Sequence, residues 1–426
     1  MNKLRIILAA GLLVLLSGAA LAQIGLGGLG GGLGAKLPGG LNTPLNTPLN
    51  NSWGTINRAT GRLDQDLHNT VQTARDLVGR PADSARLLGR DDRGAAVVRN
   101  QVLAVSPSDA SLAIARQFGF SVAGRDQLDA LGLSSVTLRA PNGMDAVSAL
   151  NALRQADPQG VYDYAHIYNP AGDRQSDGAE SIMPLSAASV RIGMIDGAIE
   201  RQHPALSHAD ITAQEFAGKA GAPGSSHGTA IASLLVGKER GFSGYLPAGK
   251  LFAADVFGGA ANGGSAADIA RALNWMAANK IAVTNISLAG PPNALLAAAV
   301  KAFLASGHAL VAPVGNDGPA APPNYPAAYP GVIAVTSVDA RGNLQIDANR
   351  GYARYAAQGV NVRAANLPGG YANVTGTSYA TPAVSAHLAT LIETPDVASV
   401  HDAIDKLQPI AVPIQTGDGS PLLLVR

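Results

Sequence analysis

The chain has no cysteine, few aromatic side chains and few charges. The absence of cysteine in 426 residues excludes disulfides, thiol chemistry and cysteine-based zinc sites. Charged residues make up only 14%, and 31 Lys+Arg nearly balance 30 Asp+Glu, so no strong field attracts nucleic acid or an anionic membrane. What the chain does have is 47% hydrophobic residues and 50 glycines. This composition is typical of a loop-rich globular protein with low-complexity sequence attached.

The first 22 residues have the pattern of a secretory signal peptide. Lys3 and Arg5 precede an apolar run over residues 6–16, and the small-x-small pattern ALA follows at 20–22. An uncleaved membrane anchor is the alternative, but the run is short for a span of about 20 residues. No later segment is apolar for long enough to cross a bilayer, so we expect no stable membrane insertion. The sequence predicts export, either to a periplasm or out of the cell.

The rest of the chain is too long for a single domain of roughly 100–200 residues. Residues 23–52 are rich in Gly, Leu and Pro and repeat LNTP, which is typical of a flexible linker. Residues 53–94 are polar, with Leu63, Leu67 and Val71 at helical spacing, so we expect a helical segment. That apolar stripe either packs on a neighbouring element or binds a partner.

Residues 95–170 read as a small α+β unit. The pattern predicts strands and helices in the order β-α-β-β-α-β, the ferredoxin-like arrangement. The alternative is an unrelated small domain. The expected strands cover 97–105, 120–123, 136–139 and 161–168, and the helices follow Ser106 and include 144–153. Residues 171–187 are polar and irregular, and we interpret them as a linker.

Residues 188–426 alternate apolar strands with helical segments, which predicts an α/β fold with a parallel sheet and helices on both faces. The strands are near-continuous apolar runs, as expected for strands buried on both sides. The expected strands are 190–195, 251–256, 283–287, 309–314 and 332–338, and the expected helices are 228–236, 266–278, 293–306 and 382–392.

Four polar residues stand at the boundaries of these elements. Asp196 and Asn316 follow predicted strands, His227 opens a predicted helix, and Ser378 lies in GTSYATP at 376–382 before another. Each has a structural alternative: a turn aspartate, a helix-start histidine, a turn asparagine and a helix-capping serine. Active sites of open α/β sheets gather at the carboxyl ends of strands, which favours a shared site.

The order Asp, His, Asn, Ser in these contexts resembles the subtilisin-like serine proteases. The resemblance implies that Ser378 is the nucleophile, His227 the general base and acid, Asp196 its orienting carboxylate, and Asn316 an oxyanion donor. It also implies that residues 95–170 are a propeptide, a chaperone and inhibitor, and that 171–187 is the processing linker. The chain departs from the family after the aspartate, where the family usually has Thr or Ser and then Gly and this chain has Gly197 and Ala198. It departs again after His227, where Ala230 stands in place of the family's usual second histidine.

The same resemblance places a substrate-binding strand edge at Ser287, Leu288, Ala289 and Gly290, with 258–264 as the opposing rim. It implies protein or peptide substrates, the chain's own propeptide in cis, and no cofactor. Calcium is frequent in the family, but no dense cluster of acids marks a metal site. The alternative is a catalytically silent binding protein on the same fold, suggested by the altered loop at Gly197 and by a short pocket wall at 319–325.

Overall fold

The computed structural model describes residues 88–172, 174–175, 182–185, 190–217, 221–258, 264–408, 411–415 and 421–425. Residues 1–87 lie outside this range, so the signal peptide, the linker at 23–52 and nearly all of the expected helical segment at 53–94 remain predictions. The last part of that segment differs from the expectation. Leu88–Arg90 forms strand β1, which pairs with β2 instead of continuing a helix.

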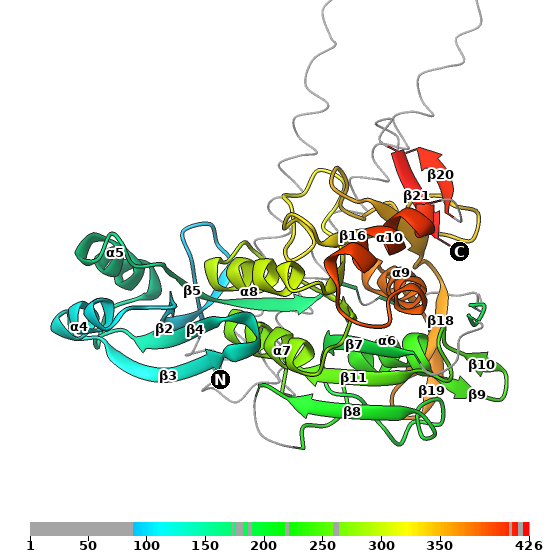
Figure 1. Ribbon diagram of the computed structural model, residues 1–426, viewed down its shortest axis with the longest axis horizontal. Helices are drawn as coiled ribbons and strands as arrows, with labels where there is room; N and C mark the ends of the chain where they lie inside the picture. Colours follow the sequence, from blue (N-terminus) through cyan, green and yellow to red (C-terminus); the bar gives the residue numbers. More distant parts are fainter. Residues whose placement is uncertain are drawn as a thin grey trace, which may run out of the picture. The chain divides into compact units, whose positions relative to one another are not determined.

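A nine-stranded sheet forms the centre of the larger part of the molecule (Figure 1). Its order is β20-β21-β17-β16-β15-β13-β7-β11-β8, and all neighbouring strands are parallel except β20 and β21. The strands are β7 (Arg191–Asp196), β8 (Asp210–Glu215), β11 (Lys250–Asp255), β13 (Val283–Ile286), β15 (Ala309–Pro313), β16 (Ile333–Val338), β17 (Tyr355–Gln358), β20 (Val412–Gln415) and β21 (Pro421–Val425). The expected α/β fold is confirmed.

Helices cover both faces of this sheet, as the sequence predicts. Helices α6 (Ser226–Val236), α9 (Thr377–Leu391) and α10 (Val397–Leu407) share one core with the sheet. Helices α7 (Ala266–Ala278) and α8 (Ala294–Ala305) share the core on the other face. Strand β7 contributes to both cores, because successive side chains of a strand face opposite sides of the sheet. Ile192 and Met194 belong to the core with α6, α9 and α10, and Ile195 belongs to the core with α7 and α8.

The smaller part has the predicted β-α-β-β-α-β order (Figure 1). It consists of β2 (Ala96–Val105), α4 (Asp109–Gln117), β3 (Ser121–Leu128), the 3₁₀ turn η1 (Asp129–Leu131), β4 (Leu133–Arg139), α5 (Ala146–Ala156) and β5 (Tyr162–Pro170). The strands pair antiparallel in the order β5-β2-β4-β3, which is the ferredoxin-like topology.

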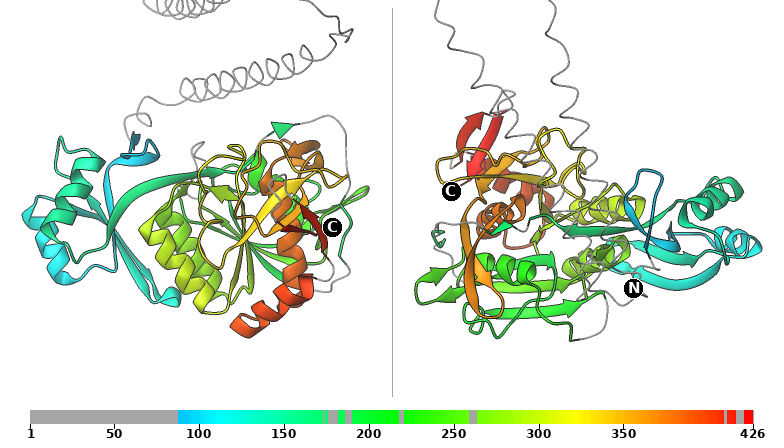
Figure 2. Two further views of the ribbon diagram at one scale, coloured as in Figure 1. Left: turned by 90° about the horizontal axis from the view of Figure 1, so that it is seen from above. Right: turned by 180° about the vertical axis from the view of Figure 1, so that it is seen from behind.

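The ferredoxin-like sheet lies between two helical layers (Figure 2). Val102 and Ala104 face α4 and α5, whereas Leu103 between them joins the core formed with α7 and α8. Polar contacts reinforce this docking at the start of α8. The Ala294 N–H donates to Asp163 Oδ2 at 2.7 Å, and Asn293 Nδ2 donates to the Tyr164 carbonyl at 3.0 Å.

Several predicted bounds were wrong in informative ways. Helix α9 begins at Thr377, ahead of the expected start at Pro382, so this proline lies inside the helix. Because proline has no N–H, the carbonyl four residues earlier has no helical donor. That carbonyl, of Ser378, accepts from Ser287 Oγ at 3.2 Å. Strand β8 was missed because its sequence, DITAQE, is polar and mostly exposed at a sheet edge.

Candidate active site

Asp196 and His227 are hydrogen-bonded to each other in the interior. Asp196 is the last residue of β7 and is fully buried, and His227 lies in the first turn of α6 with 4% exposure. His227 Nδ1 and Asp196 Oδ1 are 2.9 Å apart. Such a contact fixes the ring orientation and the tautomer that carries a proton on Nδ1.

The unusual Gly197 has a steric reason. A Cβ at this position would lie 2.5 Å from Ser225 Oγ, which caps α6 by accepting from the Gly228 N–H at 2.9 Å. The Gly197 N–H also donates to Asp196 Oδ1 at 2.7 Å. The departure from the usual Thr or Ser therefore leaves room for the helix cap beside the histidine, and it leaves the Asp196–His227 contact in place.

A second strand-end carboxylate, Asp255, lies beside Asp196 in the sheet register. Burial raises the pKa of Asp255; the N–H groups of Phe257 and Gly258, which donate to its Oδ1, oppose this, and the charges of Glu215 and Asp196 add to the rise. Asp255 thus holds the loop after β11, while Asp196 is hydrogen-bonded to the histidine. The sequence did not single out Asp255.

Ser378 is fully buried in the first turn of α9 and does not cap the helix. Gly376 occupies the N-cap position, and Ser378 Oγ donates instead to the Ala171 carbonyl at 2.5 Å. The ring of the next residue, Tyr379, lies 5.4 Å from the His227 ring between centroids. This contact brings the start of α9 to the histidine.

Three donors meet at the oxygen of one peptide carbonyl, that of Ala171. Besides Ser378 Oγ, the Ser378 N–H donates to it at 3.2 Å and Asn316 Nδ2 at 2.7 Å. A carbonyl with a backbone N–H and an amide aimed at its oxygen is the arrangement that stabilises an oxyanion. Because C=O measures about 1.23 Å, Ser378 Oγ lies no more than about 3.7 Å from the carbonyl carbon.

The orientation of Asn316 is set by two groups that the sequence did not reveal. Its Oδ1 accepts from the Thr377 N–H at 3.0 Å and from Gln345 Nε2 at 2.9 Å. Gln345 is 6% exposed, and its Oε1 accepts from Ser337 Oγ. With both donors on Oδ1, the amide nitrogen must point to Ala171.

The segment that leads to Ala171 is the end of strand β5. It lies between two short strands of the larger part, β14 (Leu288–Ala289) and β12 (Gly264–Ser265), and we call the space between them the groove. On one side β5 pairs antiparallel with β14, with Pro170 opposite Leu288 and Asn169 opposite Ala289. On the other it pairs with β12, with Tyr168 opposite Gly264. The Ala171 N–H donates to the Ser287 carbonyl at 3.3 Å. The segment 287–290 and Gly264 of the expected rim therefore flank an extended peptide.

The chain beyond Gly172 is also held by the larger part. Strand β6 (Arg174–Gln175) pairs antiparallel with β19 (Gly370–Thr375), which itself pairs with β18 (Val362–Asn366). Further on, the Leu185 N–H donates to the Tyr245 carbonyl at 2.8 Å. The peptide thus crosses the whole site, with contacts on both sides of the Ala171–Gly172 bond.

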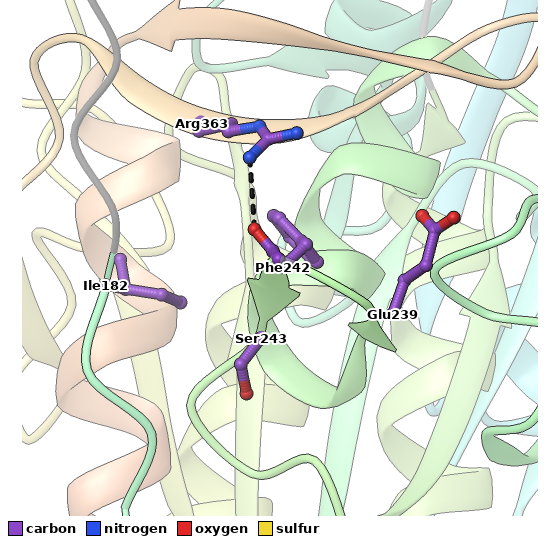
Figure 3. A pocket seen from close by; sticks show the side chains of 6 residues that line it. Ile182, Glu239, Phe242, Ser243 and Arg363 are labelled. Carbon is purple, nitrogen blue, oxygen red and sulfur yellow. Dashed lines mark hydrogen bonds between the residues drawn. The ribbon is translucent and has the colours of Figure 1, made fainter.

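A separate hollow of about 360 Å³ lies near the hairpin of β9 (Lys238–Glu239) and β10 (Phe242–Ser243) (Figure 3). Arg363, whose guanidinium donates to the Gly241 carbonyl at 3.1 Å, lines this hollow together with Ile182 of the segment 182–185. None of the four candidate catalytic residues lines this hollow.

Comparison with known proteins identifies the family. Residues 187–409, just over half of the 426, match the model described as the subtilase family. The chain belongs to the subtilase family. Over 205 residues it is 33% identical to subtilisin Savinase of Lederbergia lenta, covering 47% of this chain and 75% of that protein. Over 213 residues it is 33% identical to M-protease of Shouchella clausii, covering 49% of this chain and 55% of that protein.

Two solved structures of proteases resemble this chain in fold. Fervidolysin from Fervidobacterium pennivorans, described as a keratinolytic enzyme related to subtilisin, is 18% identical with a TM-score of 0.64. The match covers 78% of this chain and 60% of fervidolysin, so it extends beyond the family segment at 187–409. The protease domain of PatA is 26% identical with a TM-score of 0.50, covering 57% of this chain and 95% of that domain. The chain spans little more than half the length of M-protease.

The described residues also bear on metals and membranes. They contain no group of three or more His, Asp or Glu side chains placed to hold a metal ion. Within the same residues, no helix combines the length and the apolar character needed to span a bilayer.

Proposed function

We propose that this subtilase is a serine endopeptidase made as a precursor that cleaves its own Ala171–Gly172 bond. The observation that carries the proposal is the Ala171 carbonyl, which receives Ser378 Oγ, the Ser378 N–H and Asn316 Nδ2 at 2.5, 3.2 and 2.7 Å. A serine that capped α9 would accept from N–H groups of its own helix, whereas Ser378 Oγ lies against the carbonyl of another segment. A nucleophile that faces its substrate has this placement.

The proposed reaction gives each group around the Ala171 carbonyl, and the Asp196–His227 pair, one role. Ser378 Oγ attacks the Ala171 carbonyl carbon while His227 takes the hydroxyl proton, and Asn316 with the Ser378 N–H stabilises the oxyanion. The Ala171–Gly172 amide bond then breaks as His227 gives the proton to the Gly172 nitrogen. Water hydrolyses the resulting ester by the same route and frees Ser378. Asp196 stabilises the imidazolium in both halves, and no step calls for a cofactor.

After cleavage, the proposed product remains in the groove. Residues 162–171 keep the backbone pairing with β14 and β12, and the ferredoxin-like unit keeps its core with α7 and α8. The new carboxylate at Ala171 therefore blocks the site until the unit departs. This supports the expected division into a propeptide at 95–170, a processing linker at 171–187 and a catalytic domain at 188–426, with the propeptide extended by β1 at its start and by Ala171 at its end.

Other proteins and peptides are the proposed substrates once the groove is empty, since the edges flanking β5 bind the backbone of an extended chain. The signal-like residues 1–22 support export, and one relative, 31% identical over 212 residues, is named minor extracellular protease Epr, from Bacillus subtilis. A stable membrane anchor is not part of the proposal.

The test uses the precursor without residues 1–22 and two serine variants of helix α9. We expect wild type to break between Ala171 and Gly172, as read by intact mass and N-terminal sequencing, and Ser378→Ala to stay whole. Ser385→Ala is the matched control, because it also removes a buried hydroxyl of α9, one bonded to Asn285 at 3.0 Å. It should still cleave.

A fluorophosphonate probe completes the test, since it reacts quickly only with an activated serine. Self-cleavage by Ser378→Ala in a clean preparation would refute the proposed nucleophile. A wild type that stays whole and unlabelled would instead favour a silent binding protein on this fold, the alternative that the sequence leaves open.

A further inference from the structure

Asp255 is a buried carboxylate that the proposed reaction does not use. It is the last residue of β11, is 6% exposed, and lies opposite Asp196 in the parallel register of β11 and β7. The Val256 N–H donates to the Asp196 carbonyl at 2.9 Å, so the pairing continues past both carboxylates. Because neighbouring strands lie about 4.8 Å apart, Asp255 is directly beside the carboxylate that holds His227.

Both aspartates point to the face of the sheet that carries α6. Met194 and Ala253 belong to the core with α6, α9 and α10, and each stands two residues before one of the aspartates. Since side chains two residues apart in a strand share a face, Asp196 and Asp255 lie on this side as well. Helix α6 contacts both strands, and its one ionisable side chain is that of His227.

The loop after β11 accounts for only one oxygen of Asp255. Its Oδ1 accepts from the N–H groups of Phe257 and Gly258 at 2.8 and 3.0 Å. Its Oδ2 is buried and makes no hydrogen bond to the described residues. An asparagine would offer the loop the same acceptor oxygen without a charge. Holding the loop therefore does not explain why an ionisable group stands here.

The charge of Asp255 has a direct route to the histidine. Burial raises the pKa of Asp255, the N–H groups of its loop oppose this, and the charges of Glu215 on β8 and Asp196 on β7 add to the rise. Above that pKa, a second negative charge lies beside the Asp196–His227 pair. A nearby negative charge favours the protonated imidazole, so His227 then becomes a free base at a higher pH than it would with Asp196 alone.

Resting on the proposed function, we propose that Asp255 is a positioning residue that acts on His227 through its charge and sets the lower pH limit of activity. The same charge stabilises the imidazolium that forms when His227 takes the proton of Ser378. Ionised Asp255 thus makes His227 a stronger base and moves the acid limb of activity, where kcat/KM rises as His227 loses its proton, to higher pH.

The test compares wild type with Asp255→Asn, which removes the charge and keeps an acceptor for the loop. The full chain is used after self-processing. Two rates are followed against pH: kcat/KM for an internally quenched peptide of the sequence IYNPAGDRQ, residues 167–175, and labelling by a fluorophosphonate. The acid limb of both should move to lower pH by about 0.5–1 unit. The plateau of kcat/KM should fall about 2–5-fold, because the base is weaker.

The matched control is Asp396→Asn, a second aspartate that accepts from a backbone N–H. Asp396 is exposed and caps α10, where its Oδ2 accepts from the Ser399 N–H at 2.7 Å. It follows the end of α9, a helix of 15 residues and about 22 Å whose first turn holds Ser378. This change should move the acid limb by less than about 0.1 unit.

Glu215→Gln tests whether the buried neighbour or the general charge of this edge is responsible. Glu215 lies opposite Asp255 in the register, one strand further from His227, and is exposed. Solvent screens such a charge, so its loss should move the acid limb by less than about 0.2 unit. A shift as large as that of Asp255→Asn would overturn the specific role of Asp255.

Asp255→Ala separates the charge from the loop. It should give the same shift of the acid limb as Asp255→Asn, with a lower melting temperature in addition, because the N–H groups of Phe257 and Gly258 lose their acceptor. If Asp255→Ala moved the acid limb and Asp255→Asn did not, Asp255 would act through the loop and the proposal would be overturned.

The wild type separates the two proposals. If it cleaves and is labelled, but its pH profiles coincide with those of Asp255→Asn, the role of Asp255 is refuted and the endopeptidase stands. If wild type neither cleaves the peptide nor reacts with the probe at any pH, the proposed function fails, and the role of Asp255 fails with it.

Discussion

The two sheets of this molecule are covered in different ways. The nine-stranded sheet has its own helices on both faces, with α6, α9 and α10 on one side and α7 and α8 on the other. The ferredoxin-like sheet has its own helices on one face only, and its other face lies on α7 and α8. The larger part is complete without the smaller one, whereas the smaller part depends on the larger for half of its covering.

That difference explains why, in the proposed function, the larger part carries the catalytic residues and the smaller part acts as the inhibitor. Asp196, His227, Asn316 and Ser378 all belong to the self-sufficient part, so they keep their supports when the smaller part leaves. The smaller part delivers only a carbonyl, at the end of a strand that extends from its own sheet into the groove (Figure 1). Variants in each part should therefore fail differently.

The largest expected effect lies in the catalytic part. Asn316→Ala removes the only side-chain amide seen on the Ala171 carbonyl among the described residues and should slow self-cleavage by roughly 10²–10³-fold. That magnitude was measured for the oxyanion asparagine of subtilisin itself and does not come from this structure. The rate is followed by intact mass over time.

The control for this change is Asn343→Ala, which removes an exposed turn asparagine bonded to Asp339 at 2.9 Å. It should cleave at the wild-type rate. Equal rates for Asn316→Ala and wild type would mean that the amide plays no part in the reaction.

The next effect lies in the docking of the smaller part. Leu103→Ala removes a side chain buried against the core of α7 and α8 and should lower the free energy of unfolding by about 2–5 kcal/mol. Measuring this by urea denaturation in the Ser378→Ala background keeps both parts in one chain. The catalytic part, once the smaller part has left it, no longer has Leu103 beside it and should be unaffected by the change.

Val161→Ala serves as the control, since this valine is 52% exposed and its loss should cost less than about 0.5 kcal/mol. If Leu103→Ala were no more destabilising than Val161→Ala, the smaller part would not need the larger one as a cover, and the contrast between the two sheets would not hold.

The sequence predicted the four candidate residues because each stands in a local motif at an element boundary. It did not predict what holds them. Gln345 reaches Asn316 across 29 residues and Ala171 reaches Ser378 across 207, and no local pattern encodes such contacts. The start of α9 was missed because proline usually marks a helix start, and here Pro382 lies inside the helix.

The fold was predicted best where strands are apolar on both faces and worst at the margins. Strand β5 was expected to end at Tyr168, because Asn169 and Pro170 are poor strand formers. It continues to Pro170 because the groove edges supply partners on both sides. That extension, which decides the proposed function, is a tertiary effect that local propensity does not contain.

The smallest effect tests how the catalytic part holds its oxyanion donor. Gln345→Leu removes the donor on Asn316 Oδ1, so the amide keeps only the Thr377 N–H to fix its orientation. Loss of one such hydrogen bond should lower kcat on a peptide substrate about 10-fold and leave KM unchanged, because the backbone pairing that binds the substrate is intact. Since Gln345 acts only through Asn316, the double variant Asn316→Ala/Gln345→Leu should be no slower than Asn316→Ala alone. Additive losses of kcat would show instead that Gln345 supports the surrounding structure through its bonds to Ser337 and Asp347. Gln345 would then have no role in positioning Asn316.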